Sequence, residues 1–232
     1  MATHGKRYLN ALKQVEQDKV YTLAEAVALA TQIANTKFDE TLEMHFRLGI
    51  DPRQSDQQVR STVLLPHGLG KTVRVLVFAD GDDARRAEAA GADVIGDDQI
   101  IEKIQKEGWM DFDAALAVPS MMAKVGRVAR ILGPRGLMPN PKAGTVVPGD
   151  DLPRAITELK AGRVEFRNDK TGNLHVPAGK VSFDPVKLAE NAQAVLDAVM
   201  RNRPSSVKGA FIRRLVITST MGPSIHVEIA GH

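Results

Sequence analysis

The chain has 232 residues, of which 43% are hydrophobic and 25% are charged, and its formal net charge is +3. This composition is typical of a folded globular protein and argues against a disordered chain. The absence of cysteine excludes disulfides, thiol catalysis and cysteine-based zinc sites, and no two of the six histidines share the i, i+4 spacing of one helix face, so we expect no metal site.

No apolar run approaches the roughly 20 residues that a membrane-spanning helix needs. The segment 1–20 carries basic side chains but no apolar block after them, so it does not resemble a signal peptide. We therefore expect a cytoplasmic protein without a membrane partner.

The N-terminal part changes from a helical to a strand period. Thr22 and Glu25 form a capping-box pattern before apolar residues at helical spacing, which predicts a helix over 22–34. Apolar and polar residues alternate from 40 to 50, as in a strand with one buried face. The segment 59–65 is predicted to be the antiparallel neighbour of that strand.

The middle of the chain alternates buried strands with helices. Strands are predicted at 73–78, 93–95, 114–118 and 145–147, and helices at 82–90, 98–107, from Ser120 to about 132, and at 151–160. Such alternation indicates βαβ units around a parallel sheet, a Rossmann-like three-layer α/β arrangement.

After residue 162 the pattern again favours antiparallel strands. Strands are predicted at 163–166 and 174–177 and in a hairpin of 211–218 with 225–229, and a long helix from Asp184 to about 202.

Because both ends of the chain share an α+β pattern with antiparallel pairing, we infer that they form one outer domain. This discontinuous domain would comprise residues 1–66 plus 161–232, with an α/β domain inserted at 67–160. The two crossings, at 66–70 and 161–162, contain glycine and could act as a hinge.

The small net charge hides an uneven distribution. The outer segments carry 18 basic and 14 acidic side chains, and the middle carries 13 basic and 14 acidic ones. Within the middle, residues 114–149 contain no carboxylate, and their C-terminal part, 133–149, is rich in glycine and proline. The basic residues in or near this loop include Arg127, Arg130, Arg135 and Lys142. This asymmetry favours a polyanionic partner, but for the loop two interpretations stay open: a binding element, or a loop that wraps its own domain.

Motifs that resemble catalytic or nucleotide-binding sites are incomplete. Gly70-Lys71-Thr72 ends like a phosphate-binding loop, but Leu65 stands where that motif needs glycine. No GxSxG occurs, no GxGxxG follows the first strand of the middle, and the aspartate pairs there stand at helix starts, as capping residues do. We expect no enzyme and no cofactor. The alternative is a nucleotide- or sugar-phosphate-binding enzyme that uses the Rossmann-like middle domain.

Three turns or strand ends of the outer domain, at 37–41, 167–172 and 220–223, combine small, hydroxyl and cationic side chains. Structured RNA is bound by such mixtures, because cations contact phosphates and hydroxyls contact the 2′-OH. An aromatic content of 4% argues against a base-stacking platform for single strands. Phe38 and Met221 stand where the tip of a turn would expose them to RNA, although each residue taken alone is expected to pack in the core.

Several long, irregular motifs occur in order along the chain. They are GIDPR (49–53), LPHGLGK (65–71), GPRGLMPNPKAGT (133–145), FRNDKTGNLH (166–175) and STMGPSIHVE (219–228). Through these motifs the chain resembles a known family over essentially its whole length: the first-numbered proteins of the large ribosomal subunit, in their bacterial form.

The resemblance implies a structural constituent of the large ribosomal subunit that binds large-subunit rRNA and forms the mobile stalk beside the tRNA exit site. It also implies that the protein assists movement and release of deacylated tRNA at that site, and represses translation by binding its own operon mRNA. The residues implied to bind rRNA or mRNA are Lys37, Phe38, Thr41, Glu43, Asp169, Lys170, Thr220, Met221 and Gly222. Arg53 and Arg60 are implied to contact tRNA.

Overall fold

The computed structural model describes residues 4–16 and 19–229. The chain forms two compact units, one of residues 1–70 and 164–232 and one of residues 71–163. We call them the outer unit and the middle unit and describe each by itself.

The helices of the outer unit are α1 (Lys6–Leu12), α2 (Leu23–Ile33) and α8 (Pro185–Arg201), with a 3-10 turn at Ser55–Gln57. Its strands are β1 (Thr41–Leu48), β2 (Arg60–Leu64), β6 (Arg163–Arg167), β7 (Asn173–Lys180), β8 (Ile212–Ser219) and β9 (Ile225–Val227). The middle unit has strands β3 (Val75–Phe78), β4 (Val94–Ile95) and β5 (Ala114–Ala117). Its helices are α3 (Gly81–Ala89), α4 (Asp98–Glu107), α5 (Met122–Val125), α6 (Ala129–Leu132) and α7 (Leu152–Lys160).

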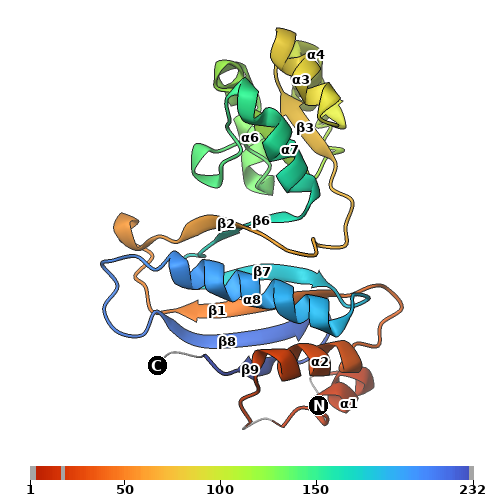
Figure 1. The fold of residues 1–232 in the computed structure, drawn as a ribbon, viewed down its shortest axis with the longest axis vertical. Helices are drawn as coiled ribbons and strands as arrows, with labels where there is room; N and C mark the ends of the chain where they lie inside the picture. The colour runs from red at the N-terminus through yellow and green to blue at the C-terminus, as the bar shows by residue number, and fades with distance from the viewer. Residues whose placement is uncertain (1–3, 17–18, 230–232) are drawn as a thin grey trace. The chain divides into compact units, whose positions relative to one another are not determined.

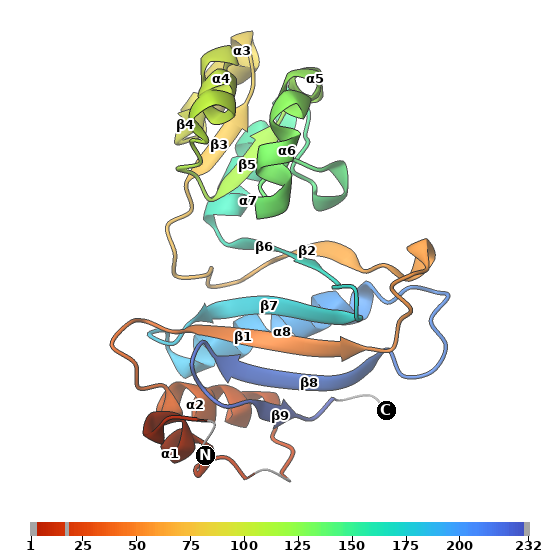
Figure 2. The ribbon, with the colours of Figure 1, turned by 180° about the vertical axis from the view of Figure 1, so that it is seen from behind.

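A four-stranded sheet with the order β7-β1-β8-β9 forms the centre of the outer unit (Figure 1). Each strand is antiparallel to its neighbours. The helices α2 and α8 pack against each other and against one face of this sheet. The opposite face, turned toward the viewer in Figure 2, is not covered by either helix. We call it the open face.

The strand predicted over 40–50 is confirmed as β1. Its apolar side chains are buried in the core of the outer unit: Leu42, Met44, Phe46 and Leu48. The side chains between them therefore lie on the open face. The helix predicted over 22–34 is also confirmed, because Thr22 and Glu25 exchange the two hydrogen bonds of a capping box at the start of α2. The long helix capped by Asp184 and the C-terminal hairpin are confirmed as α8 and β8–β9.

The pairing predicted for residues 59–65 is wrong. β2 forms a separate two-stranded sheet with β6. The reason is that both edges of β1 are already hydrogen-bonded, one to β7 and the other to β8. Alternating hydrophobicity identifies a strand, but it does not say which edge is left for that strand to join.

The parallel α/β architecture predicted for the middle unit is confirmed. Its sheet has the order β4-β3-β5 with parallel neighbours. Val75 and Val77 pack with residues of α3 and α7 on one face, and Leu76 and Phe78 pack with residues of α4, α5 and α6 on the other. The strand predicted at 145–147 is reduced to a single parallel bridge to β5.

The helix predicted from Ser120 to about 132 is broken into α5, α6 and short 3-10 segments. The first of these segments begins at Pro119 without a side-chain cap, so Ser120 does not cap a helix. The 3-10 segment between α5 and α6 begins at Gly126, and glycine inside a helix costs about 1 kcal/mol relative to alanine.

Candidate nucleic-acid interface

Seven of the nine residues expected to bind RNA lie together at the start of β1. They are Lys37, Phe38, Thr41, Glu43, Thr220, Met221 and Gly222, and we call them the first group. The turn after β8 is joined to β1 because the Thr220 hydroxyl accepts a hydrogen bond from the Thr41 amide at 2.9 Å. Phe38 and Met221 are 54% and 49% exposed. The expectation that each packs in the core is therefore wrong.

A buried carboxylate holds the turn of the first group. Glu40 directly precedes β1, is 2% exposed, and accepts a hydrogen bond from the Met221 amide at 2.9 Å. Burial alone would raise the pKa of the Glu40 carboxyl, but the hydrogen bonds that it accepts lower this pKa below its ordinary value. The ionised carboxylate thus anchors the backbone of Met221, and the Met221 side chain stays exposed.

The other two expected residues, Asp169 and Lys170, form the second group, in the loop between β6 and β7. The Asp169 carboxylate accepts hydrogen bonds from backbone and side-chain groups of Thr171 and Asn173 at 2.7 to 3.0 Å. Burial opposes ionisation, but these bonds hold the pKa of Asp169 far below its ordinary value. Asp169 therefore shapes the loop. Lys170 is exposed, and its side chain has no hydrogen bond or ion pair within the described chain.

Arg47, near the end of β1, connects the second group to the sheet. Its guanidinium donates to the carbonyl of Thr171 and, at 3.0 Å, to Oδ1 of Asn173. Thr41 and Arg47 are six residues apart on one strand, so the two groups stand roughly 20 Å apart along the open face.

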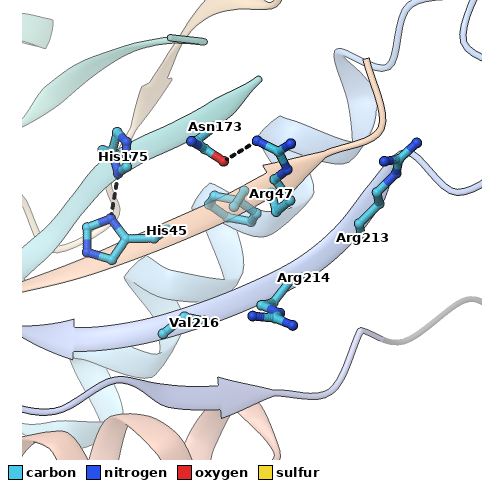
Figure 3. Close-up of a pocket in the computed structure, with 8 residues that line it drawn as sticks. His45, Arg47, Asn173, His175, Arg213, Arg214 and Val216 are labelled. Carbon is cyan, nitrogen blue, oxygen red and sulfur yellow. Dashed lines mark hydrogen bonds between the residues drawn. The ribbon is translucent and has the colours of Figure 1, made fainter. Parts of the chain in front are cut away.

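Between the two groups the open face forms a shallow hollow of about 560 Å³ (Figure 3). Its lining residues are His45, Phe46, Arg47, Asn173, His175, Arg213, Arg214 and Val216. None of them is a carboxylate. The Nδ1 atoms of His45 and His175 lie 2.8 Å apart in a hydrogen bond, so at least one ring is neutral. Burial and the neighbouring His175 lower the pKa of His45, and Glu43 opposes this shift.

An irregularity in β8 places two arginines in this hollow. Arg47 pairs with Arg214, but Leu48 pairs with Ile212, so Arg213 is an extra residue on β8. A bulge of this kind re-aims the side chains around it. Arg213 and Arg214 are both exposed and both line the hollow (Figure 3).

Arg53 and Arg60, the residues implied to contact tRNA, do not lie on the four-stranded sheet. Arg53 is exposed in the loop after β1. Arg60 begins β2, and its guanidinium forms an ion pair with Glu165 at 2.5 Å. The structure therefore does not place them within either group.

The middle unit presents carboxylates where its fold would hold a phosphate. α3, which follows the central strand, has Asp82 and Asp83 in its first turn, and these charges oppose an anion at the helix N-terminus. The loop at 133–149 packs on its own unit, since Ala143 is buried and its carbonyl accepts a hydrogen bond from Arg163 at 2.9 Å. Four exposed basic side chains take no part in that packing: Arg127, Arg130, Arg135 and Lys142.

Over residues 4–16 and 19–229, no three histidine, aspartate or glutamate side chains are grouped so that they could hold a metal ion. In the same ranges, none of the helices combines the length and the apolar character needed to cross a bilayer.

Comparison with known proteins places the chain in a family. The family described as "Ribosomal protein L1p/L10e family" matches residues 29–223, which include both groups and the hollow. The chain belongs to the ribosomal protein L1p/L10e family. The large ribosomal subunit protein uL1 of Chloroflexus aurantiacus is 58% identical to this family member over 98% of the chain and 96% of the relative. The proteins of the same name from Thermus thermophilus and Mycobacteroides abscessus are 56% and 55% identical over 98% of the chain, and over 99% and 96% of their own lengths.

This L1p/L10e protein is thus a ribosomal protein: a structural constituent of a ribonucleoprotein that takes part in translation and binds ribosomal RNA. The resemblance predicted from the motifs is confirmed. The family is one of ribosomal proteins and not a class of enzymes, which supports the expectation of binding without catalysis.

Four residues that shape this face of the L1p/L10e protein were not identified from the sequence: Glu40, Arg47, Arg213 and Arg214. The alternation along 40–50 already places Arg47 on the polar face of its strand. The pair Arg213-Arg214 has no such signal, because strict alternation would turn one of the two into the core.

Proposed function

We propose that this protein occupies the large subunit of cytoplasmic ribosomes and binds large-subunit rRNA through the first and second groups of its outer unit. The main observation behind the proposal is the turn of Thr220 and Met221, which hydrogen bonds to Thr41 and Glu40 hold at the start of β1. In this position the side chains of Met221 and Phe38 are exposed. Its location in the large subunit is supported by the relatives, which are large-subunit proteins.

The chemistry of the two groups matches that of structured RNA. Lys37 and Lys170 are exposed cations suited to phosphates, and Phe38 and Met221 offer apolar surface to ribose and base. Glu43 accepts hydrogen bonds from 2′-hydroxyls or base amino groups. Because one sheet holds the two groups roughly 20 Å apart, a folded RNA contacts both without paying the ordering cost of a flexible strand.

Binding of purified variants to large-subunit rRNA over a series of salt concentrations tests the assignment. Met221→Ala should weaken binding by about 1 to 3 kcal/mol, as for a positioned base or sugar contact. Lys170→Ala should weaken it and reduce the slope of log K against log salt by about one unit. The matched control is Lys187→Ala, an exposed lysine on α8. Wild-type affinity in both test variants would mean that Met221 and Lys170 do not contact the rRNA.

The same two groups bind the protein's own operon mRNA in our proposal and thereby repress its translation. Repression then requires that the mRNA present a fold like that of the rRNA site. In a cell-free translation system, added protein should lower synthesis from this mRNA, and excess rRNA should restore it. Repression that persists unchanged with Met221→Ala and excess rRNA would contradict a shared site.

For tRNA, we propose that the protein assists movement and release of deacylated tRNA at the exit site as part of a mobile stalk. Arg53 supports a separate contact, because its exposed guanidinium lies outside both rRNA groups. Ribosomes that carry Arg53→Ala and Arg60→Ala should release deacylated tRNA at an altered rate and still contain the protein. An unaltered release rate would remove these two residues from the tRNA contact.

A further inference from the structure

We infer that the hollow on the open face is a binding site for the sugar-phosphate backbone of the bound RNA. In this site Arg47, Arg213 and Arg214 contact the phosphates. The inference rests on the proposed RNA-binding function. It adds to the two groups a contact on the β8 side of this face, opposite Arg47 at the end of β1.

The hollow carries positive charge that the outer unit does not neutralise. Three of its lining side chains are guanidinium groups, and none is a carboxylate. The side chains of Arg213 and Arg214 are exposed, and neither makes a hydrogen bond or ion pair with another residue that the structure describes. Their N–H groups are therefore available, and the planar guanidinium fork matches the oxygens of a phosphate.

The carboxylates nearest to the hollow face its two imidazoles and form no ion pair with Arg213 or Arg214. Glu43 has its Oε2 3.8 Å from Nε2 of His45. Asp169 accepts hydrogen bonds from Thr171 and Asn173 at both oxygens, and its Oδ2 lies 3.9 Å from Nε2 of His175. Neither acid competes with an incoming phosphate for the guanidinium groups of Arg213 and Arg214.

The bulge in β8 places the side chains of Arg213 and Arg214 on the same face of the sheet. In a regular strand, consecutive side chains point to opposite faces, so Arg213 or Arg214 would be driven into the core. The extra residue leaves both side chains on the open face, opposite the end of β1. A bulge gives up ladder hydrogen bonds, and bulges are over-represented beside functional sites.

A polynucleotide is the occupant that fits the position and chemistry of this hollow. An RNA that touches both groups crosses the hollow between them, and its phosphates recur every few ångströms along the strand. Arg47 lines the hollow, and its guanidinium donates to Oδ1 of Asn173 (Figure 3) and to the carbonyl of Thr171. The remaining lining includes Val216 and the imidazoles of His45 and His175, which accommodate ribose without adding negative charge.

The test compares the double variant Arg213→Gln/Arg214→Gln with the wild type in binding to large-subunit rRNA over a salt series. We expect the dissociation constant to rise about 10- to 100-fold and the slope of log K against log salt to fall by about two units, one for each phosphate that an arginine no longer neutralises. Arg201→Gln, an exposed arginine in the last turn of α8, is the matched control and should bind like the wild type. Equal unfolding midpoints establish that the variants are folded.

A second variant, Arg213→Lys/Arg214→Lys, keeps the charge and removes the fork. It should retain the salt slope and lose only part of the affinity, because lysine contacts phosphate as a point charge. If the glutamine variant binds like the wild type while Met221→Ala binds weakly, the inferred phosphate-binding site is wrong and the proposed function stands. If Met221→Ala also binds like the wild type, the proposed RNA-binding groups fail as well. An equal loss of affinity in the lysine and glutamine variants, with an unchanged slope of log K against log salt, would also contradict the inferred phosphate-binding site.

Discussion

Two carboxylates, Glu40 and Asp169, lie within a surface assigned to a polyanion, and each accepts hydrogen bonds from neighbouring protein groups. Glu40 accepts the amide of Met221, and Asp169 accepts groups of Thr171 and Asn173. In both cases the hydrogen bonds favour the ionised form over the effect of burial. These acids position the residues next to them and leave the neighbouring cations available to RNA.

Removal of the Glu40 carboxylate should destabilise the outer unit. In Glu40→Ala the Met221 amide loses its acceptor, at a cost of about 1 to 3 kcal/mol in the free energy of unfolding. Urea denaturation at neutral pH measures this, with Glu228→Ala as an exposed control expected within about 0.5 kcal/mol of the wild type. A Glu40→Ala protein as stable as the control would mean that the turn does not depend on this anchor.

Stability should fall with acid in a manner that depends on Asp169. Its folded-state pKa is below the ordinary value of 3.8, so the unfolded chain takes up protons first as the pH falls. The stabilisation is fully present above that ordinary value and is lost as the pH falls through the folded pKa. Asp169→Asn should therefore flatten the decline of the unfolding free energy between about pH 4.5 and pH 2. Urea midpoints across this range give the comparison, with exposed Asp56→Asn expected to retain the wild-type slope.

Elements of this protein were predictable where one local pattern decided the structure. The capping box of α2 and the alternation in β1 are examples, because both depend on residues within a few positions of each other. The partner of β2 and the bulge in β8 were not predictable, because each depends on which strand edge or register a distant segment offers. Helix α1 was not predicted either, and it has no side-chain cap and no acidic residue in its first turn.

The broken helix between Pro119 and Leu132 can be tested at its glycine. Gly126 has an αR backbone, and a Cβ added there meets nothing within 4 Å. Gly126→Ala should therefore stabilise the middle unit by about 0.4 to 1 kcal/mol, since alanine loses less conformational entropy on folding. The thermal unfolding midpoint should rise.

Gly144→Ala is the matched variant for which we expect the opposite change in the unfolding midpoint. Gly144 has a φ of +61°, and an added Cβ would lie 2.3 Å from a guanidinium nitrogen of Arg163. This variant should lower the midpoint, because the backbone becomes strained and the added methyl crowds the guanidinium. A Gly126→Ala protein with a lowered midpoint would mean that the break in the helix is needed for packing.

At the scale of the whole molecule, the chain combines two units with separate cores. The proposal that residues 1–66 plus 161–232 form one domain and residues 67–160 another agrees with the distribution of charge, because the basic excess falls on the outer segments. Both groups and the hollow belong to the outer unit. RNA binding should therefore not require the middle unit.

A protein of residues 1–70 joined to 164–232 by a flexible glycine-serine linker tests this. We expect one cooperative unfolding transition, because the outer unit has its own hydrophobic core. We also expect it to bind large-subunit rRNA like the whole chain. Failure to fold would contradict the domain proposal, whereas a folded protein that does not bind would contradict the location of the RNA face.

The sequence by itself determined the family, the fold class and most of the helices and strands. Those features rest on local periodicity and on long irregular motifs, which are complete within a short stretch of chain. The tertiary structure alone decided that Phe38 and Met221 are exposed, that Glu40 holds their turn, and that Arg213 and Arg214 share one face. Each of these features depends on a contact between residues far apart in the chain or on the register of two strands. Local hydrophobicity determines neither the contacts nor the register.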